Sequence, residues 1–299
     1  MHDQLIWRKD RLLLNDLVFR LEHFKSDDWE LGDECFRFYK TEFLVDQYEN
    51  FWSFRRDFYP QNILELGVWD GGSVAFWFER FQPQKHVGID IQQKHDSRYF
   101  QQYVAQRNLN NRIKVYWGTD QADSQRIREI VAQEFHEPLD LVIDDASHVY
   151  NWTKASFETL FPYLRPGGLY IIEDWAWGYW KEFQAPDHPW AKDIPLTRLI
   201  TEQIGALGSG QGSTSMQGLL IGNVTVFQGF AVIERGELKL PMQKDFKLGE
   251  FITVRSEVEC SAMPTPLAAR RTVKTMLLNL SHQDGFRWLR HFRSLLRER

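Results

Sequence analysis

The chain has 299 residues, 43% of them hydrophobic, which is enough to bury one large core. Its two cysteines exclude a disulfide framework, and no apolar run approaches the length of a membrane span. A formal net charge of -5 argues against general nucleic-acid binding, and the N-terminus has no apolar signal region, so the cytoplasm is the expected location.

Residues 1–58 are predicted to form a mostly helical N-terminal extension. Leu14, Leu17, Val18 and Leu21 have the spacing of one apolar helix face. We expect this extension to pack on the core or to cap it.

Residues 59–236 alternate predicted strands and helices, which indicates an α/β core with a mostly parallel sheet. A first strand ends at Glu65 and leads into a glycine-rich turn that contains Gly67 and Gly71. A second strand ends at Asp90. A carboxylate at this position can accept hydrogen bonds from both hydroxyls of a ribose, so the turn and the acid together predict a nucleoside cofactor.

Two features favour S-adenosylmethionine over NAD as that cofactor. The Glu65 carboxylate would attract a cationic amino group and repel a pyrophosphate. Residues 224–234 predict a hairpin around a tight glycine turn, and its reversed strand is typical of class I methyltransferases. The predicted fold is therefore Rossmann-like, with a mostly parallel sheet closed by an antiparallel hairpin and with helical N- and C-terminal extensions.

Two further apolar runs end in carboxylates, and each run is of the kind that forms a buried parallel strand. Ligands bind at this edge of open α/β sheets. If the two strands are neighbours, one site receives four polar side chains, Asp145, His148, Glu173 and Asp174. Hard oxygen ligands suit magnesium or calcium, and the histidine can take a proton. One acid at a strand end more often caps a helix, but four polar groups on two strand ends favour a site.

The spacing of several motifs resembles a known family. The motifs are Asp144-Asp145-Ala146-Ser147-His148, Ser156-Phe157, Leu160-Phe161-Pro162, Pro166-Gly167-Gly168-Leu169-Tyr170 and Ile172-Glu173-Asp174. Over about residues 60–178 the chain resembles the metal-dependent sugar O-methyltransferases of macrolide biosynthesis, the macrocin and mycinamicin type. The resemblance implies that Asp145, Glu173 and Asp174 hold magnesium or another divalent cation, and that His148 is the base.

The stretch 118–123 resembles the segment that this family places beside the adenine, usually Gly-Asp-Gln, with Thr119 inserted here. The resemblance implies that Asp120 and Gln121 contact the adenine.

These features predict a metal-dependent enzyme that transfers a methyl group from S-adenosylmethionine to a hydroxyl of a sugar, glycan or glycosylated natural product. One alternative is a non-catalytic nucleoside-binding protein that docks through a basic C-terminal helix. A second alternative is an NAD-dependent oxidoreductase, which Glu65 and the terminal hairpin fit poorly. Homo-oligomer formation stays open.

Two segments outside the motifs invite both a structural and a functional interpretation. The aromatic run 175–180, with Trp190 beyond it, is either an acceptor wall or core packing. Residues 237–299 are predicted to hold a linker at Pro264 and Pro266 and two helices, the second with a row of arginines. That basic face either docks on the protein or makes peripheral contact with an anionic membrane or a partner.

Overall fold

The computed structural model describes residues 5–8, 10–21, 35–93, 96–188, 190–209, 218–240 and 245–253. The chain divides into two units, Met1–Thr253 and Val254–Arg299, and every described residue belongs to the first. The predicted C-terminal linker and its two helices lie outside the described residues. Within the described part of the chain, no helix is long and apolar enough to cross a membrane.

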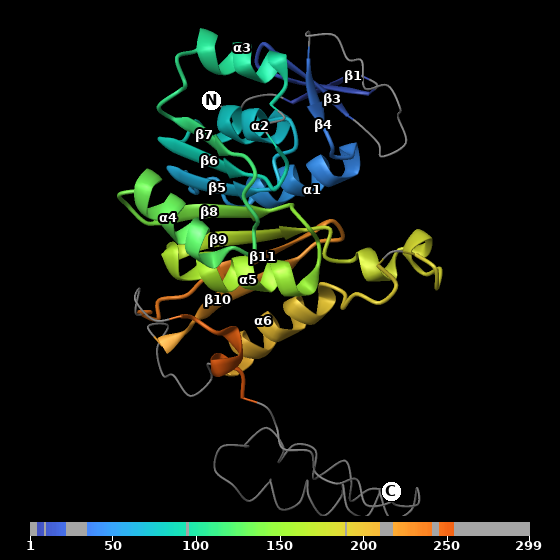
Figure 1. The fold of residues 1–299 in the computed structure, drawn as a ribbon, viewed down its shortest axis with the longest axis vertical. Helices are drawn as coiled ribbons and strands as arrows, with labels where there is room; N and C mark the ends of the chain where they lie inside the picture. The colour runs from blue at the N-terminus through green and yellow to red at the C-terminus, as the bar shows by residue number, and fades with distance from the viewer. Residues whose placement is uncertain are drawn as a thin grey trace, which may run out of the picture. The chain divides into compact units, whose positions relative to one another are not determined.

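The core of the first unit is a seven-stranded sheet (Figure 1). Its strands are β5 (Asn62–Leu66), β6 (Lys85–Ile89), β7 (Ile113–Tyr116), β8 (Leu139–Asp144), β9 (Leu164–Glu173), β10 (Ile221–Val226) and β11 (Phe230–Arg235). They lie in the order β10-β11-β9-β8-β5-β6-β7. Strand β11 is antiparallel to both its neighbours, and all other neighbours pair in parallel. The predicted Rossmann-like sheet with a closing hairpin is confirmed.

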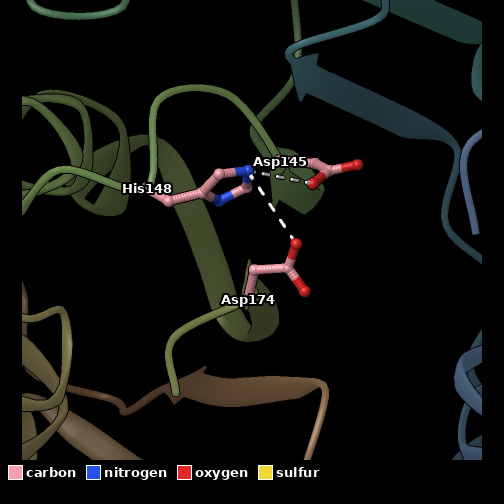
Figure 2. A group of neighbouring side chains, drawn as sticks. All are labelled: Asp145, His148 and Asp174. Atoms are coloured by element: carbon pink, nitrogen blue, oxygen red, sulfur yellow. Dashed lines mark ion pairs between the residues drawn. The ribbon is translucent and has the colours of Figure 1, made fainter. Parts of the chain in front are cut away.

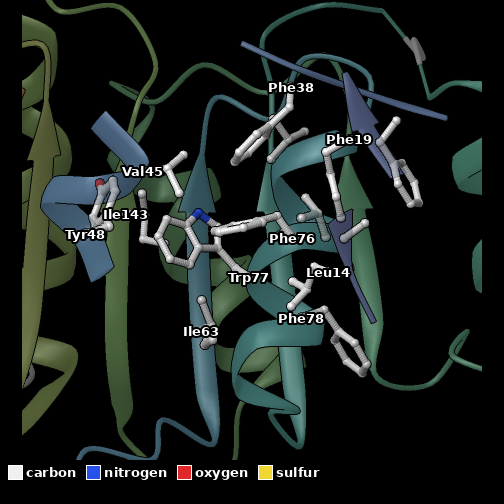
Figure 3. Close-up of a cluster of buried hydrophobic side chains, with 14 of the residues drawn as sticks. Leu14, Phe19, Phe38, Val45, Tyr48, Ile63, Phe76, Trp77, Phe78 and Ile143 are labelled. Carbon is white, nitrogen blue, oxygen red and sulfur yellow. The ribbon is translucent and has the colours of Figure 1, made fainter. Parts of the chain in front are cut away.

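Helices cover both faces of this sheet. They are α1 (Glu42–Ser53), α2 (Gly72–Phe81), α3 (Arg98–Gln106), α4 (Ser124–Glu134), α5 (Tyr150–Leu160) and α6 (Thr197–Ser209). Because side chains alternate along a strand, Leu141 and Ile143 of β8 pack with α1, α2 and α3, whereas Val142 packs with α4, α5 and α6. Figure 3 shows part of the first cluster, in which Trp77 lies next to Tyr48 with their ring centroids 4.8 Å apart. The carboxyl ends of the parallel strands are thus held at one common edge.

In the described part of the N-terminal extension, four strands precede a single helix, so the prediction that residues 1–58 are mostly helical is wrong. Its strands are β1 (Ile6–Arg8), β2 (Arg11–Leu14), β3 (Leu17–Leu21) and β4 (Phe36–Phe38), and α1 is its one described helix. Leu12, Leu14, Leu17 and Phe19 are buried with a period of two across the β2–β3 hairpin. Asn15, with φ of 55°, forms the tight turn between these strands, and that turn breaks the helical spacing seen in the sequence.

The small sheet β1–β4 packs on α2 beside the main sheet (Figure 1). The Phe19 ring stacks on Phe36 with centroids 5.0 Å apart and meets Phe76 of α2 edge-on at 5.7 Å. Strand β4 then leads directly into α1, which begins after its cap Thr41. The short link between β4 and α1 places Lys40 inside the protein, where it is 3% exposed.

Candidate active site

Two acids and a histidine meet where β8 and β9 end. The strands pair in parallel, with Asp144 opposite Ile172, so Asp145 and Asp174 follow them at neighbouring positions. Figure 2 shows His148 facing both acids: its Nε2 lies 3.8 Å from Asp145 Oδ1 and 4.0 Å from Asp174 Oδ2. One ligand atom from each of the three lies within 4.8 Å of the others. The structure therefore brings together three of the four predicted residues.

The fourth, Glu173, lies deeper and contacts other side chains. Lys40 Nζ donates to its Oε1 at 2.8 Å and to its Oε2 at 2.7 Å, and the Tyr48 hydroxyl donates to Oε1 at 2.7 Å. The same ammonium donates to Asp145 Oδ2 at 2.9 Å. Sequence reasoning missed Lys40 and Tyr48, because nothing in the local pattern links them to acids more than a hundred residues later in the chain.

The crowded carboxylates influence one another's protonation. Burial raises the pKa of Glu173 to about 7, the Asp145 carboxylate adds to this rise, and Lys40 opposes it. Burial also raises the pKa of Asp145 and of Asp174, while His148 opposes the rise at both acids. The side chains of Asp145 and Asp174 are still 21% and 33% exposed. Hard oxygen donors that remain accessible and repel one another are a donor set that fits a divalent cation.

His148 and Asp174 both adopt a left-handed backbone conformation, with φ of 56° and 50°. For residues other than glycine this conformation costs roughly 1 to 2 kcal/mol. Contacts with neighbouring segments hold both: Trp177 Nε1 donates to the His148 carbonyl at 2.8 Å, and the Asp174 amide donates to the Gly229 carbonyl at 2.8 Å. Strain that the surrounding structure maintains is characteristic of functional sites.

A buried hydrogen-bond network supports the loop that follows β8. The Asp144 carboxylate accepts from Ser156 Oγ at 2.6 Å, from the Tyr170 hydroxyl at 2.9 Å and from Gln121 Nε2 at 3.2 Å. The Gln121 oxygen accepts from the Ser147 amide at 2.8 Å. Both ends of the Gln121 amide thus bind other residues of the protein and support the loop. The adenine contact predicted for Gln121 stays a prediction.

Its neighbour Asp120 is exposed. The Asp120 Oδ1 accepts from the Ala122 amide at 2.8 Å. The adenine contact predicted for Asp120 stays a prediction.

The glycine-rich turn lies directly against the acidic loop. The Asp145 amide donates to the Leu66 carbonyl at 2.9 Å, and a Cβ on Gly67 would come within 2.1 Å of the Asp145 carbonyl oxygen. Gly67 and Gly71 have φ of 80° and 98°, so both positions require glycine. The predicted cofactor turn and the predicted metal loop therefore form one continuous surface.

Asp90 holds the other side of this turn. Its Oδ2 accepts from the amides of Val68 and Trp69, both at 2.9 Å, and its Oδ1 accepts from the Gln92 amide at 2.9 Å. Since each carboxylate oxygen has two acceptor sites, Oδ1 keeps capacity for a ligand hydroxyl.

Glu65 is fully buried and contacts a histidine. Its side chain has no exposed surface, and its Oε2 lies 3.1 Å from His86 Nε2 on the neighbouring strand. The structure thus corrects the prediction that this carboxylate is open to a cationic amino group. The position at the end of a strand was predicted from the sequence, but the direction in which the side chain points was not.

The aromatic segment after Asp174 combines packing with a position beside the histidine. Trp177, on the short helix η2 (Trp177–Tyr179), is buried. Its ring centroid lies 5.2 Å from that of Trp190. Trp190 in turn lies 6.4 Å from the His148 ring, whereas Tyr179 is 71% exposed. Core packing thus explains Trp177, and Trp190 is the tryptophan of this segment whose ring lies beside the His148 ring.

Comparisons with known proteins find similarity to methyltransferases. Residues 64–175 match the family model described as a methyltransferase domain. The demethylmacrocin O-methyltransferase of Streptomyces fradiae is 31% identical over 188 residues, covering 58% of this chain and 44% of the relative. The mycinamicin VI 2''-O-methyltransferase of Micromonospora griseorubida is 36% identical over 143 residues, 45% of this chain and 32% of that protein.

Among solved structures, the MycE methyltransferase from the mycinamycin biosynthetic pathway, in complex with Mg, SAH and mycinamycin VI, is 28% identical with a TM-score of 0.48. That alignment covers 67% of this chain and 50% of MycE. The chain spans less than half the length of the two curated relatives above. Residues 64–175 therefore match a methyltransferase domain, in a chain that resembles the macrocin and mycinamicin type of sugar O-methyltransferases.

Proposed function

We propose that this protein transfers the methyl group of S-adenosylmethionine to a hydroxyl oxygen of a sugar, on a glycan or a glycosylated natural product. The observation that carries the proposal is the direct contact between the glycine-rich turn at Gly67 and the loop that holds Asp145 and His148. This contact joins a place for the cofactor to a place for the acceptor. The acidic loop lies within a methyltransferase domain, and curated relatives named as sugar O-methyltransferases support the acceptor class.

The turn would hold the cofactor, with its glycines allowing close approach of the backbone and Asp90 accepting from the ribose. Asp145 and Asp174 would hold a divalent cation on the accessible side of the cluster, and Glu173 would support them from the interior. A bound divalent cation lowers the pKa of a coordinated hydroxyl. His148 would remove the proton of that hydroxyl, and the loop contacts keep its ring aimed at the space between the two acids.

Because the sulfonium carries a good leaving group, the protein's main task is to place the acceptor oxygen in line with the methyl group. The proposal is tested by incubating the protein with methyl-labelled S-adenosylmethionine, magnesium and a panel of glycosylated macrolides. Mass spectrometry of the products and of any cofactor retained on purification identifies the transfer. Absence of both labelled product and bound cofactor would contradict the proposal.

Cofactor binding should appear as thermal stabilisation. We expect S-adenosylhomocysteine to raise the melting temperature while NAD does not. At a ligand concentration a hundredfold above the dissociation constant, the free energy of unfolding should rise by about 2.7 kcal/mol. Asp90→Ala should lose this gain because the ribose acceptor is removed. Asp245→Ala, which removes an exposed carboxylate that pairs with Arg128, is the control and should keep it. Equal stabilisation by NAD would favour the oxidoreductase alternative.

Trp190 is the aromatic side chain that we expect to line the acceptor site. Replacing it with alanine should raise the KM for the acceptor at least fivefold while the KM for S-adenosylmethionine changes less than twofold, since the ring lies beside His148. Steady-state kinetics with an acceptor identified in the labelling assay provide the measurement. Trp175→Ala, whose indole nitrogen donates to the Phe227 carbonyl, is a matched control. A loss of thermal stability with unchanged KM would show that Trp190 is core.

A further inference from the structure

Lys40 reaches the acidic cluster from outside the methyltransferase domain. Residues 37–40, which we call the strap, comprise the end of β4 and the start of its link to α1. The strap contacts the glycine-rich turn and the acids. A Cβ on Gly72 would come within 1.8 Å of the Arg37 carbonyl oxygen. The ring centroid of Tyr39 lies 5.1 Å from that of Trp69. The last residue of the strap, Lys40, contacts the acids.

The ammonium of Lys40 divides the oxygens of the cluster into two groups. It contacts both oxygens of Glu173 and Oδ2 of Asp145, at 2.7 to 2.9 Å. The other oxygen of Asp145, Oδ1, faces His148. Lys40 thereby fixes the Asp145 carboxylate in the orientation that turns Oδ1 toward the accessible side of the cluster.

We propose that Lys40 is a positioning residue of the metal site: it neutralises Glu173 and holds Asp145 so that Oδ1 is available to a divalent cation. This inference rests on the proposed function and deepens it. Without the ammonium, Glu173 would be a buried carboxylate with no cation, and its repulsion would push the Asp145 carboxylate out of its orientation. The strap would thus make the N-terminal extension part of the active site.

The test replaces Lys40 with methionine, which has a similar shape but no charge, and titrates magnesium calorimetrically. We expect the magnesium dissociation constant to rise at least tenfold, the usual effect of losing a partner of a ligand side chain. Affinity for S-adenosylhomocysteine, measured without metal, should change less than threefold. Lys85→Met is the matched control, because Lys85 pairs with Glu134 at the opposite edge of the sheet.

If Lys40→Met does not fold, Lys40→Gln keeps a donor without the charge and should bind magnesium at least fivefold more weakly than the wild type. Magnesium binding in the folded variants that is equal to or tighter than wild type would overturn the inference, since the ammonium would then only compete with the ion. Wild-type protein that binds S-adenosylhomocysteine but no magnesium would also overturn it, while leaving methyl transfer standing. Wild-type protein that binds neither would instead contradict the proposed function.

Discussion

EDTA should abolish methyl transfer, and magnesium or manganese should restore it. Asp145 and Asp174 present oxygens from the ends of two neighbouring strands, and burial raises the pKa of both acids. A divalent cation would relieve the repulsion between the carboxylates and activate the acceptor hydroxyl at the same place. Initial rates before and after dialysis against EDTA provide the measurement. S-adenosylhomocysteine affinity should change less than threefold, since the cofactor turn supplies its own contacts.

Substitutions of the acids should reproduce chelation to different degrees. We expect Asp145→Asn and Asp174→Asn to lower turnover at least a hundredfold and to weaken magnesium binding. Glu173→Gln should weaken it less, because both Glu173 oxygens contact Lys40 rather than the accessible side of the cluster. Asp245→Asn, at an exposed ion pair, is the control. Full activity in EDTA, with no metal in the purified protein, would show that the acidic cluster has another role.

The sequence predicted the parts of the fold that depend on strong local patterns. Apolar strands that end in acids located Asp145 and Asp174 correctly, because parallel strands share a carboxyl edge and two buried strands in sequence order were adjacent. The N-terminal extension was predicted wrongly because Leu14, Leu17 and Leu21 fit a helical spacing, and the turn at Asn15 decides in favour of a hairpin.

Side-chain direction was harder to predict than position. Glu65 and Gln121 lie at the predicted edge, yet the first is buried against His86 of the neighbouring strand and the second supports the loop at Ser147. Such directions depend on partners supplied by other elements. Lys40 is the extreme example, because its contacts with Asp145 and Glu173 exist only once the N-terminal extension has packed on the core.

Replacing His148 should remove the proton acceptor while leaving the rest of the site intact. Asparagine is the informative substitution, because it tolerates the left-handed backbone conformation found at this residue yet cannot take a proton at neutral pH. We expect His148→Asn to lower turnover about a hundredfold or more, the usual contribution of a general base. Turnover should fall at least as far in His148→Ala, because alanine also disfavours the left-handed backbone conformation at this position.

Binding should separate a base from a metal ligand. The dissociation constants of His148→Asn for magnesium and S-adenosylhomocysteine should stay within threefold of the wild type, because Asp145 and Asp174 still supply the oxygens and the turn is unchanged. His136→Asn, at an exposed histidine after α4, is the matched control and should keep full activity. If His148→Asn instead loses magnesium in parallel with activity, His148 is a ligand of the ion, and the base must be sought elsewhere at this edge.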